Sequence, residues 1–233
     1  MKLEKITNRE APTARRSYDD ACAAAHALDL IGERWALLVI RELMFGPKRF
    51  SDLRSDLPGI SANVLTQRLE GLEEAGILRK SKLPPPASVQ VYELTEWGYE
   101  AEPILQTLGR WAARSPSHDP NLPISTTSFL LSLRTMISPE RSQDMNAVIG
   151  LKLDDEDFTA HLHNGRLEVK RGKAEQYDIA FESSPRMMAA AIYGGQPLIA
   201  LEEANLLTLN GDHALAEKFI TLFPLPAKAP LQK

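Results

Sequence analysis

The sequence predicts an α+β protein in two parts: a helical amino-terminal part with one basic hairpin, followed by an antiparallel sheet covered by helices. Three observations support this. Apolar residues recur at helical spacing before residue 115, whereas apolar and polar residues alternate after residue 157. Between them, the stretch 115–123 contains three prolines and no apolar periodicity, which is typical of a linker. We therefore expect domains at residues 1–117 and 124–233.

The composition of the 233-residue chain is that of a globular protein, with 25% charged and 43% hydrophobic residues. No apolar run approaches the roughly 18 residues of a membrane helix, so no membrane partner is expected. The first ten residues lack the apolar segment of a secretory signal. Because Cys22 is the only cysteine, no disulfide can form within the chain, and the expected compartment is the cytoplasm.

The net charge of −4 lies entirely in the second half of the chain. Residues 1–117 carry 16 basic and 16 acidic side chains, whereas residues 118–233 carry 11 and 15. The segment 48–82 holds seven basic and five acidic residues, with the basic ones at both of its ends. The acidity of the whole chain therefore does not exclude binding to nucleic acid.

Three helices are expected first. The segment from Tyr18 to Leu30 opens with two aspartates, which favour a helix start. The segment from Trp35 to Phe45 is apolar on most sides, which predicts a buried helix ended by Gly46-Pro47. A short helix from Phe50 to Leu57 follows, with Ser51 as the expected N-cap.

The next helix, which begins at the expected N-cap Ser61, has one apolar and one polar face. Leu65, Leu69 and Leu72 form the apolar stripe. The opposite face carries four hydrogen-bonding side chains that we expect to read bases: Asn63, Thr66, Gln67 and Arg68. Asn and Gln pair with adenine and Arg with guanine in the major groove. The alternative is that this face is only solvated.

A basic hairpin follows this helix. Gly76 ends the helix, and two strands from Ile77 to Lys82 and from Val89 to Leu94 flank three consecutive prolines. A hairpin beside a groove-reading helix forms a wing that contacts phosphates. The residues expected to bind phosphate are Lys48, Arg49, Ser61, Arg79, Lys80 and Lys82. The order of these elements predicts a winged helix-turn-helix that binds double-stranded DNA.

A long helix is expected from Thr95 onward, mildly kinked at Pro103. Its apolar stripe is predicted to form a homodimer interface and includes Trp97, Ile104, Leu105, Leu108 and Trp111. The alternative is that this stripe packs within its own chain.

These motifs together resemble the HxlR family of winged-helix transcription regulators over roughly residues 18–115. The resemblance rests on Leu28-Asp-Leu-Ile-Gly-Glu-Arg-Trp35, Gly46-Pro-Lys-Arg-Phe-Ser-Asp-Leu53, Leu65-Thr-Gln-Arg-Leu69, Leu72-Glu-Glu-Ala-Gly-Ile77 and Tyr92-Glu-Leu-Thr95. It implies a homodimer on a pseudo-palindromic DNA site. Ala23 stands where the family usually has a proline after its cysteine, which weakens any transfer of redox sensing to Cys22. The proline-rich wing tip is longer than is usual in the family.

The second part is predicted to be an antiparallel sheet covered by helices on one side. Asn164-Gly165 is a strong hairpin signal between two alternating segments. With the Ser-Pro-initiated helix at 184 and Gly194-Gly195, this order resembles the sterol carrier protein (type two) fold. That resemblance implies a tunnel for an apolar small molecule, which would modulate DNA binding. Its expected lining is Met187, Met188, Ala191, Ile192, Leu198 and Leu201, and the alternative is that these residues fill an ordinary core.

Neither a catalytic motif nor a cofactor-binding motif was found, so no enzyme, cofactor or metal site is predicted. His161 and His163 share a strand face, for which a solvated surface is the favoured interpretation and the start of a metal site the alternative. The acidic run 154–157 is interpreted as a solvated turn, with calcium binding as the alternative. Cys22 is either a redox thiol or an inert packed thiol. Two rival functions are an apolar-metabolite carrier that uses the winged helix only to dimerise, and an enzyme that turns over its ligand.

Overall fold

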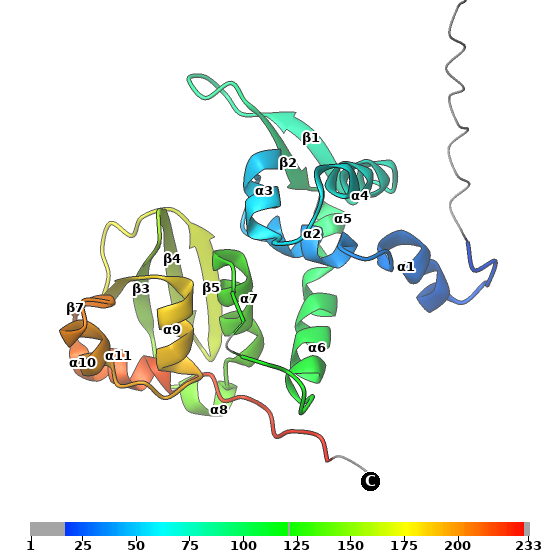
Figure 1. Ribbon diagram of the computed structural model, residues 1–233. Helices are drawn as coiled ribbons and strands as arrows, with labels where there is room; N and C mark the ends of the chain where they lie inside the picture. The colour runs from blue at the N-terminus through cyan, green and yellow to red at the C-terminus, as the bar shows by residue number, and fades with distance from the viewer. Residues whose placement is uncertain (1–16, 121, 231–233) are drawn as a thin grey trace, which may run out of the picture.

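The structure is a computed structural model that describes residues 17–120 and 122–230 (Figure 1). The amino-terminal segment considered for a signal, and the outer ends of the domains expected at 1–117 and 124–233, lie outside these residues. The first part contains α1 (Ala23–Ile31), α2 (Ala36–Glu42), α3 (Phe50–Asp56), α4 (Ala62–Glu74), β1 (Leu78–Lys82), β2 (Gln90–Leu94), α5 (Glu96–Tyr99) and α6 (Glu102–Ala113). The second part contains α7 (Thr126–Met136), α8 (Pro139–Ser142), β3 (Ala147–Leu153), β4 (Glu156–His163), β5 (Arg166–Arg171), β6 (Ile179–Ser183), α9 (Pro185–Ile192), α10 (Leu198–Glu203), β7 (Leu207–Gly211) and α11 (His213–Ile220).

Helices α2, α3 and α4 pack their apolar residues into one core with β1 and β2, which is the winged helix-turn-helix arrangement. The predicted N-cap of α4 is confirmed, because the Ser61 hydroxyl accepts a hydrogen bond from the Val64 amide at 3.3 Å. The predicted stripe of Leu65, Leu69 and Leu72 is fully buried. Gly76, whose φ of +72° lies in the left-handed region, follows the end of the helix.

Two helix boundaries differ from the sequence prediction. α1 begins at Ala23 rather than at Tyr18, because the Asp20 carboxylate accepts a hydrogen bond from the Cys22 amide and holds the chain in a turn before the helix. At the start of α3, Arg49 and not Ser51 occupies the N-cap position. Neither change alters the order of the elements.

The single long helix expected after Thr95 is two helices, α5 and α6. Pro103 lies in the first turn of α6, where its missing N–H costs nothing. A helix that continued from α5 would place the proline ring against the carbonyl group four residues earlier. The mild kink that we predicted is therefore a break.

The second part contains a five-stranded sheet in the order β5-β4-β3-β6-β7. The prediction that this sheet is antiparallel is wrong at one pair, because β3 and β6 run parallel, with Ile149 opposite Ile179. The connection between β5 and β6 must cross the sheet to reach the far side of β3. The hairpin predicted at Asn164-Gly165 is confirmed, with φ angles of 50° and 74°.

The helices of the second part cover one face of the sheet. Alternate residues of the central strands point into a single apolar layer that includes Ile149, Phe158 and Phe181. Phe219 of α11 contacts Phe181, with ring centroids 5.9 Å apart. On the opposite face, β4 and β5 carry mostly exposed polar residues. The acidic run 154–157 includes the turn between β3 and β4, as expected.

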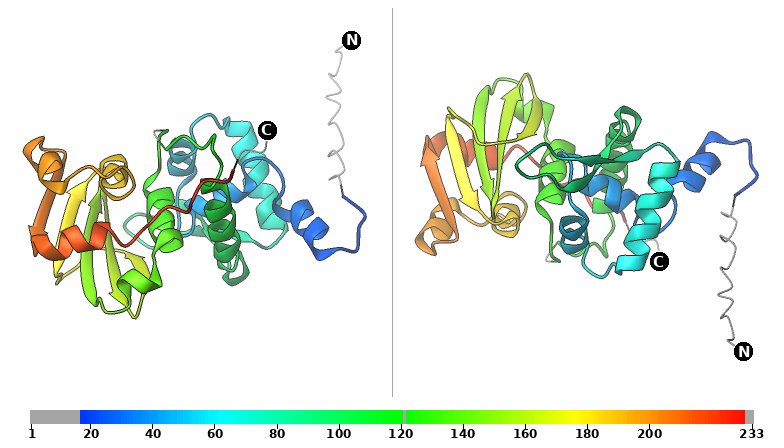
Figure 2. Two further views of the ribbon diagram at one scale, coloured as in Figure 1. Left: turned by 90° about the horizontal axis from the view of Figure 1, so that it is seen from below. Right: turned by 90° about the horizontal axis from the view of Figure 1, so that it is seen from above.

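The two parts are joined by a packed interface, although the sequence indicates a linker. The rings of Phe45 and Phe158 meet edge to face at 6.3 Å, and α6 packs along α7. The tail, which we expected to be loosely held, hydrogen-bonds to the end of α6, since the Ala229 amide lies 2.7 Å from the Arg114 carbonyl oxygen. Figure 2 shows the sheet at one end of the molecule and α4 with α1 at the other.

Candidate nucleic-acid interface

One face of α4 is exposed, polar and uncovered by the described residues. Asn63, Thr66 and Gln67 are exposed on it, and Ser61 stands at its amino-terminal end. The buried leucine stripe fixes which way this face points, because the three leucines can only turn toward the core. The face lies at the end of the molecule remote from the sheet (Figures 1 and 2). Such a helix has the dimensions and chemistry that fit a DNA major groove.

Arg68 does not share this face, contrary to our prediction. Its side chain is 22% exposed, and its guanidinium lies 3.2 Å from the Glu33 carboxylate, on the flank that faces the connection between α1 and α2. One residue is a rotation of about 100° around a helix, so Arg68 and Gln67 point in different directions. Glu70 is exposed three residues after Gln67, and sequence reasoning missed it. Glu70 could have been predicted, because its spacing from Asn63 and Gln67 places all three residues on the same face of a helix.

The wing carries basic side chains, but two of them are already paired. Arg79 lies 2.9 Å from Glu93, across the hairpin, and Lys80 lies 2.6 Å from Glu73 of α4. The hydrogen bond from Lys80 lowers the pKa of the Glu73 carboxyl and raises the pKa of the Lys80 ammonium. Lys82 is exposed, and no ion pair involves it in the part of the chain that the structure describes. It is therefore the wing cation best placed to meet a phosphate.

Lys48 is buried, so the prediction that it anchors a phosphate is wrong. The residue is 6% exposed, and its ammonium group makes three contacts. It lies 3.1 Å from Glu42, 2.6 Å from Asp56 and 3.0 Å from the Thr127 hydroxyl of α7. A lysine has three N–H donors, so all of them are used inside the protein. Arg49, the next residue, is exposed.

The contacts of Lys48 form a polar cluster between the two parts of the chain. Glu42 is fully buried and also accepts hydrogen bonds from Arg41, at 2.7 and 2.9 Å, and from Ser125, at 2.8 Å. Burial raises the pKa of the Asp56 carboxyl, and the neighbouring ammonium of Lys48 offsets part of that rise. The main chain of Lys48 pairs with Tyr92 of β2, so this cluster is also tied to the wing.

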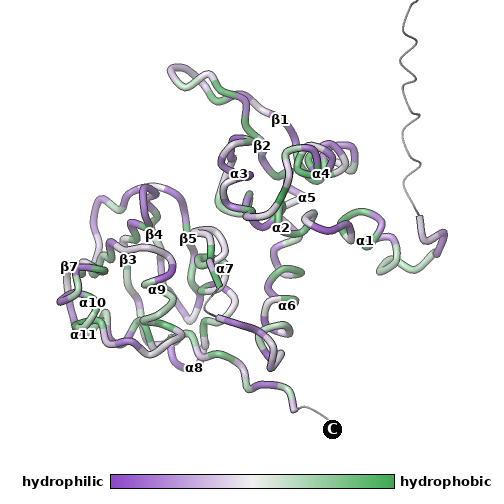
Figure 3. The backbone as a smooth tube through the Cα atoms, in the orientation of Figure 1, coloured by the Kyte–Doolittle hydropathy of each residue, from purple (hydrophilic) through white to green (hydrophobic). Residues whose placement is uncertain are grey.

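An apolar stripe on α5 and α6 is exposed to solvent in the single chain. Trp111 is 73% exposed, and Trp97, Ile104 and Leu108 are each between 43% and 50% exposed. Figure 3 shows hydrophobic residues recurring along α6. Leu105 is half-buried and packs against the core. The two faces of α6 therefore differ: one packs on α7 in the same chain, and the other is free to meet a partner.

The residues expected to line an apolar tunnel are part of the core. Met188, Ala191, Leu198 and Leu201 are buried, and Met187 and Ile192 pack against them at half burial. This burial is what the alternative of an ordinary core predicts. Two hollows at the surface of the described residues, of about 480 and 350 Å³, are lined by other residues.

Cys22 is exposed at the start of α1. Hydrogen bonds from the backbone of Ala25 and Ala24 lower the pKa of its thiol. Because its side chain is exposed, Cys22 is not the packed thiol that was one of the two alternatives for it. Among the residues that the structure describes, no three His, Cys, Asp or Glu side chains are grouped to hold a metal ion. No helix in residues 17–120 and 122–230 is both long enough and apolar enough to cross a membrane.

Known proteins resemble the first part of the chain. A family model described as HxlR-like helix-turn-helix matches residues 30–119. The uncharacterized HTH-type transcriptional regulator YvaP of Bacillus subtilis is 35% identical over 86 residues, which are 37% of this chain and 80% of that protein. The HTH-type transcriptional regulator YodB of the same organism is 38% identical over 86 residues, 37% of this chain and 77% of YodB. A structure of reduced YodB aligns with 43% of this chain and 100% of that chain, at 34% identity and a TM-score of 0.38.

Proposed function

Because the chain belongs to the HxlR-like helix-turn-helix family, we propose that it is a homodimeric transcription regulator that binds double-stranded DNA in the cytoplasm. The observation that carries the proposal is the exposed polar face of α4 beside the basic hairpin β1–β2. A helix of this kind enters the major groove while the neighbouring hairpin contacts the backbone. Both relatives are HTH-type transcriptional regulators, which favours this proposal over the rival of a catalytic pocket.

We assign base reading to Asn63, Thr66 and Gln67, whose side chains are exposed along one face. Phosphate contact is assigned to a second set of exposed residues: Arg49, Ser61, Arg79, Lys80 and Lys82. Arg79 and Lys80 must exchange their carboxylate partners for phosphates, so each contributes less than a free cation. Lys48 and Arg68 have no part in this assignment.

The homodimer is proposed to form through the stripe of Trp97, Ile104, Leu108 and Trp111. Exposed apolar patches of this kind mark protein interfaces more often than they mark plain surface. A two-fold dimer would present two copies of α4 to half-sites about one helical turn, ~34 Å, apart.

The second part of the chain is proposed to adjust the winged helix rather than to carry an apolar metabolite. Thr127 of the second part accepts a hydrogen bond from Lys48. Lys48 in turn contacts Asp56 of α3 and pairs through its main chain with Tyr92 of the wing, so the buried cluster links the second part to both elements. The residues expected to line a sterol-carrier-like tunnel belong to the hydrophobic core or pack against it, which favours this proposal over the apolar-metabolite carrier.

Fluorescence anisotropy with a duplex taken from upstream of the protein's own gene tests the assignment. Gln67→Ala should change which base substitutions in the site are tolerated, by about 1–3 kcal/mol at the base that Gln67 reads. Lys82→Ala should weaken all duplexes equally and lower the slope of log K against log salt by about one unit. If the two variants behave identically, or if the wild-type protein binds no duplex at low salt, the proposal is wrong.

A further inference from the structure

The tail that follows α11, residues 224–230, runs back from the second part of the chain to the end of α6 in the first part (Figure 1, red). Its Lys228 ammonium donates to the carbonyl oxygens of Ala113, at 3.0 Å, and of Ser115, at 3.1 Å. The last carbonyl groups of a helix have no partner within the helix, and the negative end of the helix dipole favours a cation there. Lys228 therefore caps the carboxyl end of α6.

The residues on either side of Lys228 bind the same helix end. The Ala229 amide donates to the Arg114 carbonyl oxygen at 2.7 Å. The Arg114 guanidinium in turn donates to the Ala227 carbonyl oxygen at 3.2 Å. Three consecutive tail residues thus make four hydrogen bonds with the end of α6, which fixes the register of the tail on the helix. We call residues 224–230 the tail strap.

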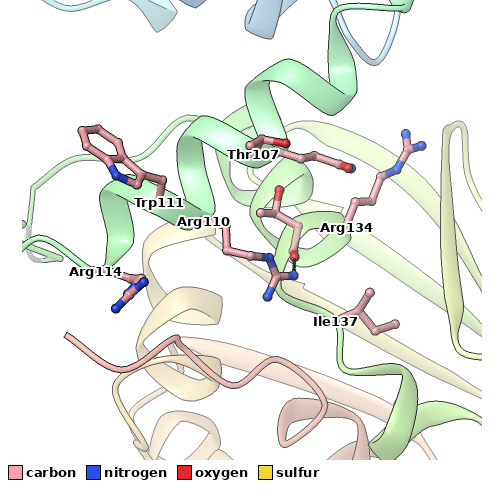
Figure 4. Close-up of a pocket in the computed structure, with 8 residues that line it drawn as sticks. Thr107, Arg110, Trp111, Arg114, Arg134 and Ile137 are labelled. Carbon is pink, nitrogen blue, oxygen red and sulfur yellow. Dashed lines mark hydrogen bonds between the residues drawn. The ribbon is translucent and has the colours of Figure 1, made fainter. Parts of the chain in front are cut away.

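The turn that the tail strap holds carries Trp111, the most exposed residue of the apolar stripe, at 73%. No residue of α6 is fully buried. In Figure 4, Trp111 and Arg114 extend from the end of α6 on the side away from Ile137, which follows α7. A helix end with few buried contacts frays readily unless its free carbonyl groups are bonded. The tail strap supplies these bonds.

We propose that the tail strap positions the last turn of α6 for dimerisation, by keeping the helix end folded so that Trp111 is presented to the partner chain. This inference rests on the proposed homodimer. A frayed turn must refold before its side chain can pack against a partner, so the fraction of chains with a folded helix end sets the apparent affinity. The second part of the chain thereby contributes to the strength of a dimer whose contacts lie in the first part.

Sedimentation equilibrium of the full chain without DNA tests the inference through the dimer dissociation constant, Kd. Ala229→Pro removes the N–H that binds Arg114, and it should raise Kd by about three- to tenfold, the equivalent of one ordinary hydrogen bond. Ala227→Pro is the matched control, because the Ala227 amide has no partner in the described residues and its carbonyl group is retained. Its Kd should stay within about twofold of the wild-type value.

Lys228→Gln removes the capping charge and should raise Kd by about threefold or more, whereas Lys173→Gln, at an exposed site in the second part, should leave it unchanged. Hydrogen exchange on dilute, monomeric protein gives a readout that does not depend on dimer contacts. The amides of residues 111–115 should exchange faster in Ala229→Pro and Lys228→Gln than in the two controls. Circular dichroism checks that every variant is folded.

Unchanged Kd or unchanged exchange in both Ala229→Pro and Lys228→Gln would overturn the inference and leave the homodimer standing. An equal rise of Kd in the control Ala227→Pro would overturn it too, because that variant keeps all four hydrogen bonds. A wild-type protein that stays monomeric at every concentration would overturn the homodimer and the inference together.

Discussion

Replacing Lys48 with methionine removes the cation at the centre of the buried polar cluster while keeping a side chain of similar length. Three hydrogen bonds are lost, to Glu42, Asp56 and Thr127. Removing one partner of a buried ion pair costs about 3–5 kcal/mol, because the remaining charge stays buried without compensation. Two features place this site at the lower end of that range. Glu42 keeps its contacts with Arg41, and Asp56 is one-third exposed, so water can replace the lost ammonium.

We therefore expect Lys48→Met to lower the free energy of unfolding by about 3 kcal/mol at neutral pH. For a chain of this size, that corresponds to a fall in Tm of about 6–12 °C. Urea denaturation followed by circular dichroism measures it. Lys82→Met is the matched control: it makes the same substitution at an exposed site and should change stability by no more than about 0.5 kcal/mol.

The pH dependence separates charge from packing in this variant. Lys48 lowers the pKa of Asp56, so its removal raises that pKa further and lets Asp56 take up a proton more readily. The penalty of Lys48→Met should therefore shrink as the pH falls toward the ordinary aspartate value of 3.8. A penalty below about 1 kcal/mol at neutral pH, or one that is the same at pH 4 and pH 7, would refute the electrostatic account.

Three further predictions concern other contacts. Because the folded-state pKa of Asp56 is raised, the contribution of this carboxyl to stability is greatest below pH 3.8 and is lost as the pH rises through its folded pKa. Asp56→Asn should therefore flatten this part of the curve of unfolding free energy against pH. An unchanged curve would contradict the assignment. Glu73→Gln frees Lys80 from its ion pair, so anisotropy titrations should show tighter binding to any duplex and a salt slope steeper by up to about one unit; an unaltered slope would place Lys80 away from DNA. Leu108→Glu puts a charge in the apolar stripe and should convert a dimer into a monomer in sedimentation experiments, whereas a dimer that persists would rule the stripe out as the interface.

Local patterns predicted the elements that depend on neighbouring residues. The N-cap at Ser61 and the leucine stripe of α4 follow from spacing within one helix, and the turn at Asn164-Gly165 follows from two residues. The strand β3 escaped prediction. From Ala147 to Leu153 only Lys152 is strongly polar, and Gly150 is buried too, so no alternation of apolar and polar residues marks this strand.

The candidate site was predictable only where exposure follows from helical geometry. Asn63, Thr66 and Gln67 lie opposite the buried stripe, as their positions require. Lys48 was assigned to phosphate because nothing near it in the sequence shows that it is buried. One of its partners, Thr127, is 79 residues away, and contacts at that separation leave no periodic signal. The prediction that Arg68 reads bases was wrong for a related reason, because its ion-pair partner Glu33 lies outside α4, in the connection between α1 and α2.

The edge-to-face contact of Phe45 with Phe158 bears on how the protein can be dissected. Phe45 belongs to the winged helix, yet its covering side chain comes from the sheet, and the buried Glu42 beside it is held in part by Ser125. Cutting the chain between α6 and α7 would bring an aromatic ring and an acid into contact with water at once. Transplanting the DNA-binding half of this chain onto another protein therefore calls for new residues at those two positions.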